Sequence, residues 1–395
     1  MQPLTGAIKR YDWGSTEVIP QMLGMQPDGL PLAEYWLGAH PAGPASIDGV
    51  RLDELIANDP AMLGDSARTE FGGRLPFMMK VLSAARPLSL QAHPDRLNAE
   101  AGYARENELD IAFDAAQRTF KDPWDKPELM VALSDFDALA GFRDPLRSAD
   151  LFMRLGLPAK TQLIFAPLQH REGPAALAEV FLDCLVLDED RRDAVTDVVS
   201  AAVRHINDGG ELGDFARTAV RLDEHFPGDP SVLAALLLNR HHLRPGDALH
   251  MRPGTLHAYL SGTCIEVMGS SDNVLRGGLT RKHIDPSALV QVVDFSANPM
   301  RPLPPELELP GLWFYPTGER AFALWRIELM PGRLIELPAQ ESSRIVLCTD
   351  GEIGLSTGQD SLICEVGRAA YLRPGEDVCI SGQGQAFLAA TGADA

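Results

Sequence analysis

The segment Leu88-Ser89-Leu90-Gln91-Ala92-His93 alternates apolar with polar side chains. A period of two is typical of a strand that buries one face in a core. Gln91 and His93 then project together from the opposite face, where an amide oxygen and an imidazole can bind a metal ion. Three further segments, far apart in the chain, offer similar ligands or positive charge: Lys126-Pro127-Glu128, His257-Ala258-Tyr259, and the cationic stretch from Arg276 to His283. Together they predict an enzyme with a mononuclear metal site.

The composition is that of an ordinary globular protein. The chain has 395 residues, of which 45% are hydrophobic and 23% are charged. Because a single hydrophobic core stops growing below this length, we expect two or three domains. No apolar run approaches the length that spans a bilayer, and the first residues do not form a charged segment followed by an apolar signal region. We therefore expect a cytoplasmic protein without a membrane partner.

The charge balance bears on the kind of partner. The formal net charge is -20, whereas sequence-independent binding of DNA or RNA needs a clustered basic surface. We therefore expect no nucleic-acid partner. The expected partner is a small molecule, and we expect the protein to be a monomer. An anionic substrate is compatible with this charge, because its recognition depends on local cations such as Arg276, Arg281 and Lys282. The five cysteines show no CxxC spacing, so we expect reduced thiols.

The organisation of the chain predicts a mainly β protein with an inserted helical domain. Residues 1–146 and 241–301 carry short apolar runs separated by Pro and Gly, which indicates short strands joined by tight turns. Residues 147–240 instead carry Ala, Leu, Val, Glu and Arg at helical spacing. Residues 302–395 are again strand-like. We expect a catalytic metal-binding domain of the jelly-roll or barrel type, a helical domain, and a C-terminal β domain without a metal site.

A weak internal repeat links the two β regions. The eight-residue spacing between Gly246 and Gly254 recurs between Gly367 and Gly375, and each second glycine belongs to an Arg-Pro-Gly turn. No histidine follows His283, so the second copy, if it is a true repeat, has lost any capacity to bind metal. Ordinary turn chemistry that arose twice is the alternative interpretation.

Four side chains are candidate metal ligands: Gln91, His93, Glu128 and His257. A catalytic zinc site needs three or four N, O or S ligands and keeps one position open. Since only one of these ligands is anionic, the ion would keep a positive charge, which favours Lewis-acid action on a substrate oxygen. Taken alone, a histidine in such a protein is more often a surface or hydrogen-bonded core residue. A polar neighbour on the same strand face, Gln91 for His93 and Tyr259 for His257, favours the metal site.

The stretch from Glu266 to Lys282 is the second informative element. Gly277-Gly278 allows the backbone to approach a ligand closely, and the flanking Arg276 and Lys282 can hold a phosphate group. A polar loop is the alternative, in which Asp272 and Asn273 would be ordinary turn formers.

Six motifs follow one another over essentially the whole chain: YDWGS from Tyr11, AEYWLGAHPAGP from Ala33, PLSLQAHPD from Pro87, KPEL from Lys126, LHAYLSG from Leu256, and EVMGSSDNVLRGGLTRKHID from Glu266. In these motifs and in their order, the chain resembles the family of type I mannose-6-phosphate isomerases. The QAHPD and SDNVLRxGLT elements are specific to that family.

The resemblance implies a fold and a set of site residues. It implies a cupin (jelly-roll) catalytic domain, a helical domain and a second cupin domain that binds no metal. One zinc ion per chain would be held by the Gln and His of QAHPD, the Glu of KPE and the His of HAY, which are Gln91, His93, Glu128 and His257 here. The family's essential arginine falls on Arg276. Ser89, Lys126 and Lys282 fall where the family lines its substrate pocket. We expect Glu266 to bind substrate as well.

Two departures from the family pattern affect the finer contacts. Trp124-Asp125 precedes the KPE element, where the family usually has Asn-His. Arg281 precedes Lys282, where the family commonly has proline. Neither departure removes a proposed ligand.

The reaction that the resemblance implies is the interconversion of mannose 6-phosphate and fructose 6-phosphate through an enediol. The metal and Arg276 would stabilise the negative charge that develops on oxygen. The base that moves the carbon-bound proton stays open among Asp272, Glu266, His283 and a metal-bound water, while Tyr259 and Lys282 can relay protons to oxygen. A cupin Fe or Mn oxygenase and a non-catalytic sugar-phosphate-binding protein are the alternatives, because the fold alone does not decide function.

Overall fold

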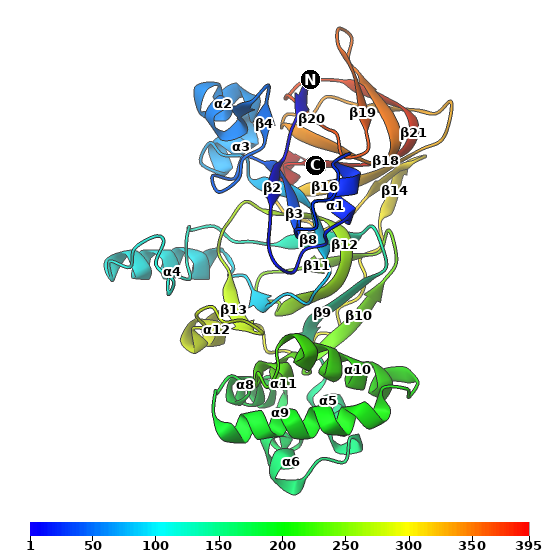
Figure 1. Ribbon diagram of the computed structural model, residues 1–395. Helices are drawn as coiled ribbons and strands as arrows, with labels where there is room; N and C mark the ends of the chain where they lie inside the picture. The colour runs from blue at the N-terminus through cyan, green and yellow to red at the C-terminus, as the bar shows by residue number, and fades with distance from the viewer. Residues whose placement is uncertain (395) are drawn as a thin grey trace.

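The computed structural model describes residues 1–394, and the strands of this region pair antiparallel in two large sheets (Figure 1). The prediction of a mainly β chain is confirmed. The first large sheet carries the candidate metal ligands. Its strands are β2 (Ala7–Lys9), β3 (Glu34–Gly38), β6 (Phe77–Ala84), β7 (Leu90–Ala92), β8 (Glu128–Ala132), β9 (Phe136–Phe142), β10 (Leu238–Leu243), β11 (Ala248–Met251), β12 (His257–Gly269) and β13 (Leu275–Gly278).

Strand β12 is the long strand around which this sheet is organised. Residues at its start pair with β7 and β9, and residues 262–269 pair with β6 and β8. Strand β13 in turn pairs with β7. The strands that carry the candidate ligands and Arg276 are therefore neighbours of β12 or of each other, although they are far apart in sequence.

The second large sheet contains the C-terminal strands and the first strand of the chain. Its members are β1 (Gln2–Leu4), β14 (Glu306–Leu309), β15 (Leu312–Phe314), β16 (Ala323–Leu329), β17 (Leu334–Leu337), β18 (Arg344–Ser356), β19 (Ser361–Glu365), β20 (Ala369–Leu372) and β21 (Val378–Ala390). Strand β1 pairs with β20 and so belongs to the second sheet, although it comes from residues 1–146. It supplies the main-chain hydrogen bonds that β20 needs on that side.

A shared hydrophobic core joins the two sheets. Val81 and Ile265 from the first sheet are buried in one cluster with Ile345 and Phe387 from the second. A separate cluster fills the interior of the second sheet. The non-directional burial of these apolar side chains stabilises the contact between the sheets.

The two sheets also share a local plan that corresponds to the weak internal repeat. Gly254 (φ 85°) lies in the turn before β12, and Gly375 (φ 79°) lies in the turn before β21. Both turns use a left-handed backbone conformation that glycine adopts without steric cost. Each of the two following strands is 13 residues long and is central in its sheet.

A run of helices lies between β9 and β10, where the sequence predicts a helical segment over residues 147–240. The helices are α5 (Pro145–Arg154), α6 (Ala159–Phe165), α7 (Pro167–His170), α8 (Gly173–Asp183), α9 (Glu189–Ala202), α10 (Gly210–His225) and α11 (Ser231–Ala235), with the 3-10 turn η2 (Val203–His205). Asp144 and Asp188 cap α5 and α9 by accepting hydrogen bonds from the backbone amides of Arg147 and Arg191. Figure 1 shows these helices gathered at one end of the molecule.

Helix α4 (Arg96–Glu108) contradicts the expectation that residues 1–146 form short strands joined by tight turns. Only Ala99, Gly102 and Glu106 are buried among its 13 residues, and its sequence has no apolar stripe. The side chain of Asp95 caps it by accepting from the backbone amide of Asn98. A solvated helix of this kind carries no helical period in its hydrophobic residues.

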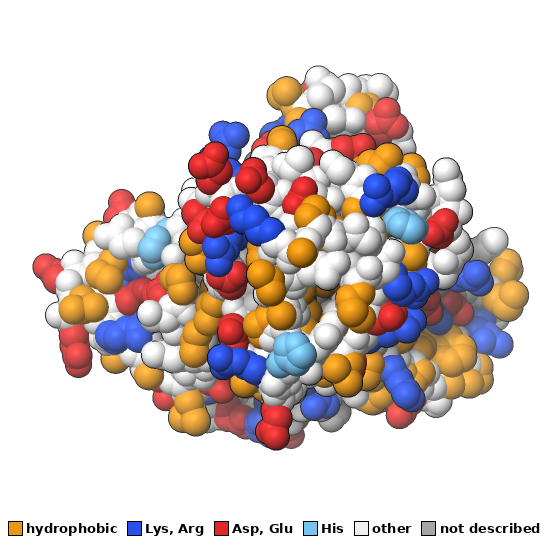
Figure 2. All heavy atoms as spheres, turned by 90° about the horizontal axis from the view of Figure 1, so that it is seen from below, with side chains coloured by type: hydrophobic (Ala, Val, Ile, Leu, Met, Phe, Trp, Pro, Cys, Tyr) orange, Lys and Arg blue, Asp and Glu red, His pale blue; other side chains and the backbone are white. Residues whose placement is uncertain are grey.

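The remaining elements are short. They are α1 (Val18–Met22), α2 (Leu52–Asn58), α3 (Asp65–Glu70), α12 (Pro286–Val292), the 3-10 turns η1 (Pro60–Met62) and η3 (Gly392–Asp394), and the small sheet of β4 (Ser46–Ile47) and β5 (Val50–Arg51). In the part of the chain that the structure describes, every helix is too short or too polar to cross a bilayer. On the face shown in Figure 2, acidic, basic and hydrophobic side chains are interspersed.

Candidate metal centre and substrate pocket

Three of the four candidate ligands meet at one point. His93 follows β7, Glu128 begins β8, and His257 begins β12. One ligand atom from each side chain lies within 4.8 Å of the others. His93 Nε2 is 3.1 Å from Glu128 Oε1, and His257 Nε2 is 3.3 Å from Glu128 Oε2. All three side chains are buried, so the cluster is shielded from bulk water.

The hydrogen bonds of the two imidazoles fix their tautomers. His93 Nδ1 lies 2.7 Å from the carbonyl oxygen of Asn273, and His257 Nδ1 lies 3.0 Å from that of Thr255. A carbonyl oxygen only accepts, so each Nδ1 carries a proton and Nε2, which faces Glu128, is the nitrogen left to bind a metal ion. Burial lowers the pKa of His93 to about 4, against the opposing charge of Glu128, and the ring is neutral at pH 7.

The electronic arrangement of this cluster fits a divalent cation. His93 Nε2 and His257 Nε2 are buried, and neither has a hydrogen-bond partner in the described residues. Two lone pairs that face a carboxylate in a dry site repel it unless a cation lies between them. Two imidazole nitrogens and one carboxylate oxygen are ligands that zinc accepts.

Glu128 is the anionic member of the cluster. Burial acts to raise the pKa of Glu128, but His93 and Lys126 outweigh it and hold that pKa well below its usual range. Because His93 is neutral at pH 7, the charge that acts there is that of Lys126, whose Nζ lies 3.2 Å from Glu128 Oε1. Glu128 is therefore ionised at neutral pH.

Gln91 lies on the same face as two other predicted site residues. It is directly opposite His257 in the pairing of β7 with β12, and opposite Arg276 in the pairing of β7 with β13. Residues directly opposite each other in an antiparallel pair direct their side chains to the same side of the sheet. Gln91 therefore flanks the cluster.

A cavity of about 1170 Å³ opens beside the cluster. It brings together all of the predicted catalytic and substrate-binding residues with two of the candidate metal ligands. Those that line it are Ser89, Gln91, Lys126, Glu128, Tyr259, Glu266, Asp272, Arg276, Lys282 and His283.

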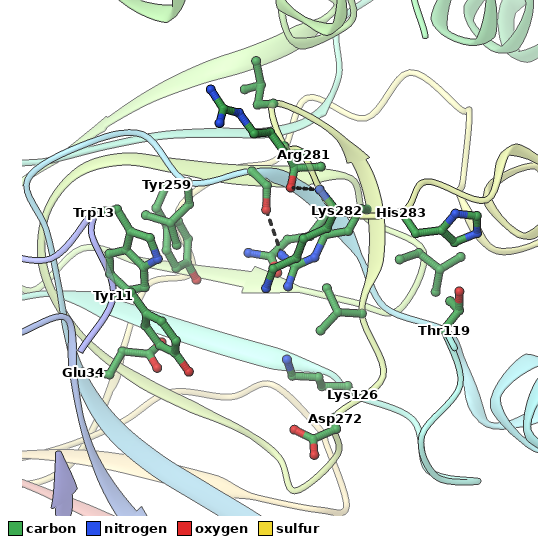
Figure 3. A pocket seen from close by; sticks show the side chains of 18 of the residues that line it. Tyr11, Trp13, Glu34, Thr119, Lys126, Tyr259, Asp272, Arg281, Lys282 and His283 are labelled. Carbon is green, nitrogen blue, oxygen red and sulfur yellow. Dashed lines mark hydrogen bonds between the residues drawn. The ribbon is translucent and has the colours of Figure 1, made fainter. Parts of the chain in front are cut away.

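A group of cations forms one part of the pocket wall. Arg276 donates from Nη1 to Ser89 Oγ at 2.8 Å. Burial lowers the pKa of Arg276, and the charge of Arg276 is the main cause of a lowered pKa at Lys282. In Figure 3 the guanidinium of Arg281 points away from the side chains around Lys282. Arg281, which stands where the family commonly has proline, is therefore exposed at the rim of the pocket.

The sequence analysis missed a buried charged pair, Lys80 with Glu34. Lys80 Nζ lies 3.2 Å from Glu34 Oε1 and 2.5 Å from Glu266 Oε2. Tyr259 donates its hydroxyl to Glu266 Oε1 at 2.7 Å, and Trp36 donates its indole N–H to Glu34 Oε2 at 2.8 Å. The sequence feature that could have revealed this pair is the lysine within the apolar run Phe77–Ala84. A strand that is buried along its whole length tolerates a charge only when the charge is paired.

The two candidate carboxylate bases lie in different environments. Burial raises the pKa of Glu266, although the charge of Lys80 opposes this shift. Asp272 instead lies at the pocket rim with 43% of its side chain exposed, 3.4 Å from His40 Nε2. Figure 3 shows Asp272 near Lys126, and Tyr11 and Trp13 on another wall of the same pocket. The rings of Tyr11 and Trp13 stack with centroids 5.5 Å apart.

Comparison with known proteins gives a consistent result. Residues 1–145 match the family model described as phosphomannose isomerase type I, catalytic domain. The chain is 34% identical to the mannose-6-phosphate isomerase of Escherichia coli (strain K12) over 400 residues, which covers 98% of each chain. It superposes on the apo form of mannose 6-phosphate isomerase from Salmonella typhimurium with a TM-score of 0.89, at 32% identity and with 99% of each chain covered. A zinc-bound structure of mannose 6-phosphate isomerase gives a TM-score of 0.88, also at 32% identity and with 99% of each chain covered.

Proposed function

Because this chain belongs to the family of type I mannose-6-phosphate isomerases, which are enzymes, we propose that it interconverts mannose 6-phosphate and fructose 6-phosphate at the pocket described above. The observation that carries the proposal is the position of the buried cluster of His93, Glu128 and His257 beside a pocket that also contains Arg276 and Lys282. A cation close to the sugar oxygens would stabilise the negative charge that develops during isomerisation of a sugar phosphate, and a separate cation would bind the phosphate group. This pocket offers both.

The metal is proposed to be zinc, one ion per chain, held by Gln91, His93, Glu128 and His257. The two unpartnered Nε2 atoms and the ionised carboxylate support this assignment. When bound, zinc supplies Lewis-acid polarisation of a sugar oxygen.

Arg276 and Lys282 are proposed to divide the negative charges of the substrate between them. Lys282 is exposed toward the pocket opening, so it suits the phosphate group. Arg276 is largely buried and is held by Ser89, which suits the oxygen on which charge develops in the enediol. A fixed donor aimed at developing charge lowers the barrier because it needs little reorganisation during the reaction.

Glu266 is proposed as the base that takes the proton from the sugar carbon and returns it to the neighbouring carbon. It is buried, its pKa is raised, and Tyr259 and Lys80 hold its two oxygens. A base works best when its pKa is near the operating pH. Asp272 is the alternative base, but as a solvated carboxylate at the rim it exchanges protons readily with water.

The two sheets are proposed to be cupin domains, with helices α5 to α11 as a third domain inserted in sequence within the first of them, between β9 and β10. Residues 1–146 and 241–301 would form the catalytic domain, apart from β1, and residues 302–395 would form a second cupin that binds no metal. The lack of any histidine after His283 supports the last point. We propose that the protein works as a cytoplasmic monomer, because one chain supplies every group of the pocket.

A coupled assay that detects fructose 6-phosphate formed from mannose 6-phosphate tests the proposal. Turnover by the zinc-loaded protein, abolished by exhaustive chelation and restored by zinc, is the expected result. Binding of mannose 6-phosphate without turnover would identify a sugar-phosphate-binding protein instead. Oxygen uptake without isomerisation would identify an oxygenase.

A further inference from the structure

Asn273 is a buried residue at the junction of three segments that carry proposed site residues. Its exposed fraction is 0%. Its carbonyl oxygen accepts the hydrogen bond from His93 Nδ1 at 2.7 Å, and three residues further along the chain lies Arg276. Asn273 therefore contacts one proposed ligand directly. It also lies two residues before β13, the strand that carries Arg276.

The side-chain amide of Asn273 binds the third segment, which leads to Lys126 and Glu128. Oδ1 accepts from the backbone amide of Lys121 at 2.7 Å. Nδ2 donates to the carbonyl oxygens of Asp122 at 2.7 Å and of Trp124 at 2.8 Å. Both ends of the amide are thus used, and an aspartate cannot replace the two donated bonds because an ionised carboxylate only accepts.

The side chain of Asp122 makes further hydrogen bonds between the same two segments. Its Oδ1 accepts the hydroxyl of Ser271 at 2.8 Å, and its Oδ2 accepts the backbone amide of Asp272 at 2.9 Å. Asn273 and Asp122 therefore form a reciprocal clasp between residues 121–124 and residues 271–273. Multiple bonds between two loops fix their relative position more firmly than any one of them, because buried hydrogen bonds are costly to leave unmade.

The side chain of Trp124 makes a second contact between segments that carry proposed ligands. Its indole ring contacts two guanidinium groups, with Arg74 at 3.9 Å and Arg96 at 3.8 Å from the ring centroid. Arg96 lies three residues after His93, so this stack joins the first ligand segment to the segment that precedes Glu128. The clasp uses the carbonyl oxygen of Trp124, so it persists although the side chains at 124 and 125 depart from the family pattern.

From these contacts we infer that Asn273 is a positioning residue for the metal centre, which it serves by holding His93 and Glu128 at the separation that a bound ion needs. The inference rests on the proposed zinc site. Residues that accept or donate hydrogen bonds to metal ligands, and so orient them, typically contribute about 10- to 100-fold to metal affinity. The clasp is the structural element that couples the two ligand-bearing segments.

The test compares Asn273→Asp with the matched control Asn239→Asp. Asn239 also donates from Nδ2 to two carbonyl oxygens, those of Gly141 and Asn298, both at 3.0 Å. It lies on β10 and does not line the pocket. Competition with a chromophoric chelator gives the zinc dissociation constant of each purified full-length variant, and circular dichroism reports whether it is folded.

The inference predicts that Asn273→Asp weakens zinc binding about 10-fold or more, while Asn239→Asp binds zinc within about twofold of the unaltered protein. Unchanged affinity in Asn273→Asp, or equal weakening in both variants, would overturn it. If Asn273→Asp does not fold, Asp122→Asn serves instead. That variant replaces one of the two acceptor oxygens of Asp122 with an N–H donor and is expected to weaken zinc binding about 10-fold; unchanged affinity there would equally overturn the inference. An unaltered protein that binds no zinc would overturn the metal centre itself.

Discussion

Lys80 lies directly opposite Glu266 in the antiparallel pairing of β6 and β12, and their charged groups are 2.5 Å apart. Both side chains are buried, and Glu34 supplies a second carboxylate to the same ammonium group at 3.2 Å. Burial acts to lower the pKa of Lys80, but Glu266 and Glu34 outweigh it and raise that pKa above its usual range. Lys80 therefore stays charged and holds Glu266 in the pocket wall.

Replacing Lys80 with methionine tests the structural importance of this pair. Lys80→Met leaves two carboxylates buried without their cation, and we expect the free energy of unfolding at neutral pH to fall by about 3 to 5 kcal/mol. Urea denaturation followed by circular dichroism measures it. Lys160→Met is the control, because Lys160 pairs with Asp190 on the surface and should contribute little. A loss no larger than that of the control would contradict the assigned role.

The pH dependence of activity tests Glu266 as the base. A base must be deprotonated to act, so activity falls as the pH falls through its pKa. Because burial raises the pKa of Glu266, the acid limb of kcat/KM should lie above the usual range of a glutamate. Lys80→Met removes the charge that opposes this shift, so the limb should move up by about one pH unit. A limb that does not move would favour Asp272 as the base.

The role of Arg276 is tested by a substitution that keeps its charge. Arg276→Lys loses the planar fork that Ser89 holds, so kcat should fall by about 100-fold while zinc content is preserved. Arg281→Lys is the matched control, since the Arg281 guanidinium points away from the group around Lys282 and its replacement should change kcat little. Equal kcat values for the two variants would exclude a special role for Arg276.

Removal of one imidazole separates metal binding from folding. His257→Ala should lose both zinc and isomerase activity and remain folded, because the cores of the sheets consist of apolar side chains rather than metal ligands. His241→Ala is the control, since His241 interacts with the Ala140 carbonyl on β9 rather than with the cluster. Elemental analysis and circular dichroism report the two properties. Full activity of His257→Ala after exhaustive chelation would contradict the metal assignment.

Local sequence patterns were sufficient to predict the β-rich character and the main site segments. The alternation around Gln91 and His93 reflects a strand with one face in the core, and this period is visible within six residues. The helical segment was visible for the same reason, because its apolar residues recur at helical spacing. The family resemblance, carried by motifs such as QAHPD, is confirmed by the comparisons.

Features that depend on tertiary pairing were not predictable in this way. The partners of Lys80 come from β3 and β12, so no local pattern around residue 80 identifies Glu34 and Glu266 as its counterions. Helix α4 has no apolar stripe to reveal it. Strand β1 lies in the second sheet because β20 is available to pair with it, and that availability is a property of the folded chain.

Anomalous diffraction at the zinc absorption edge, from crystals of the zinc-loaded protein, tests the central claim most directly. The account predicts one strong peak per chain among the side chains of Gln91, His93, Glu128 and His257, about 2.0 to 2.2 Å from the His nitrogens and the carboxylate oxygen. A zinc-loaded crystal with no peak at this position, or with its zinc bound elsewhere on the chain, would contradict it.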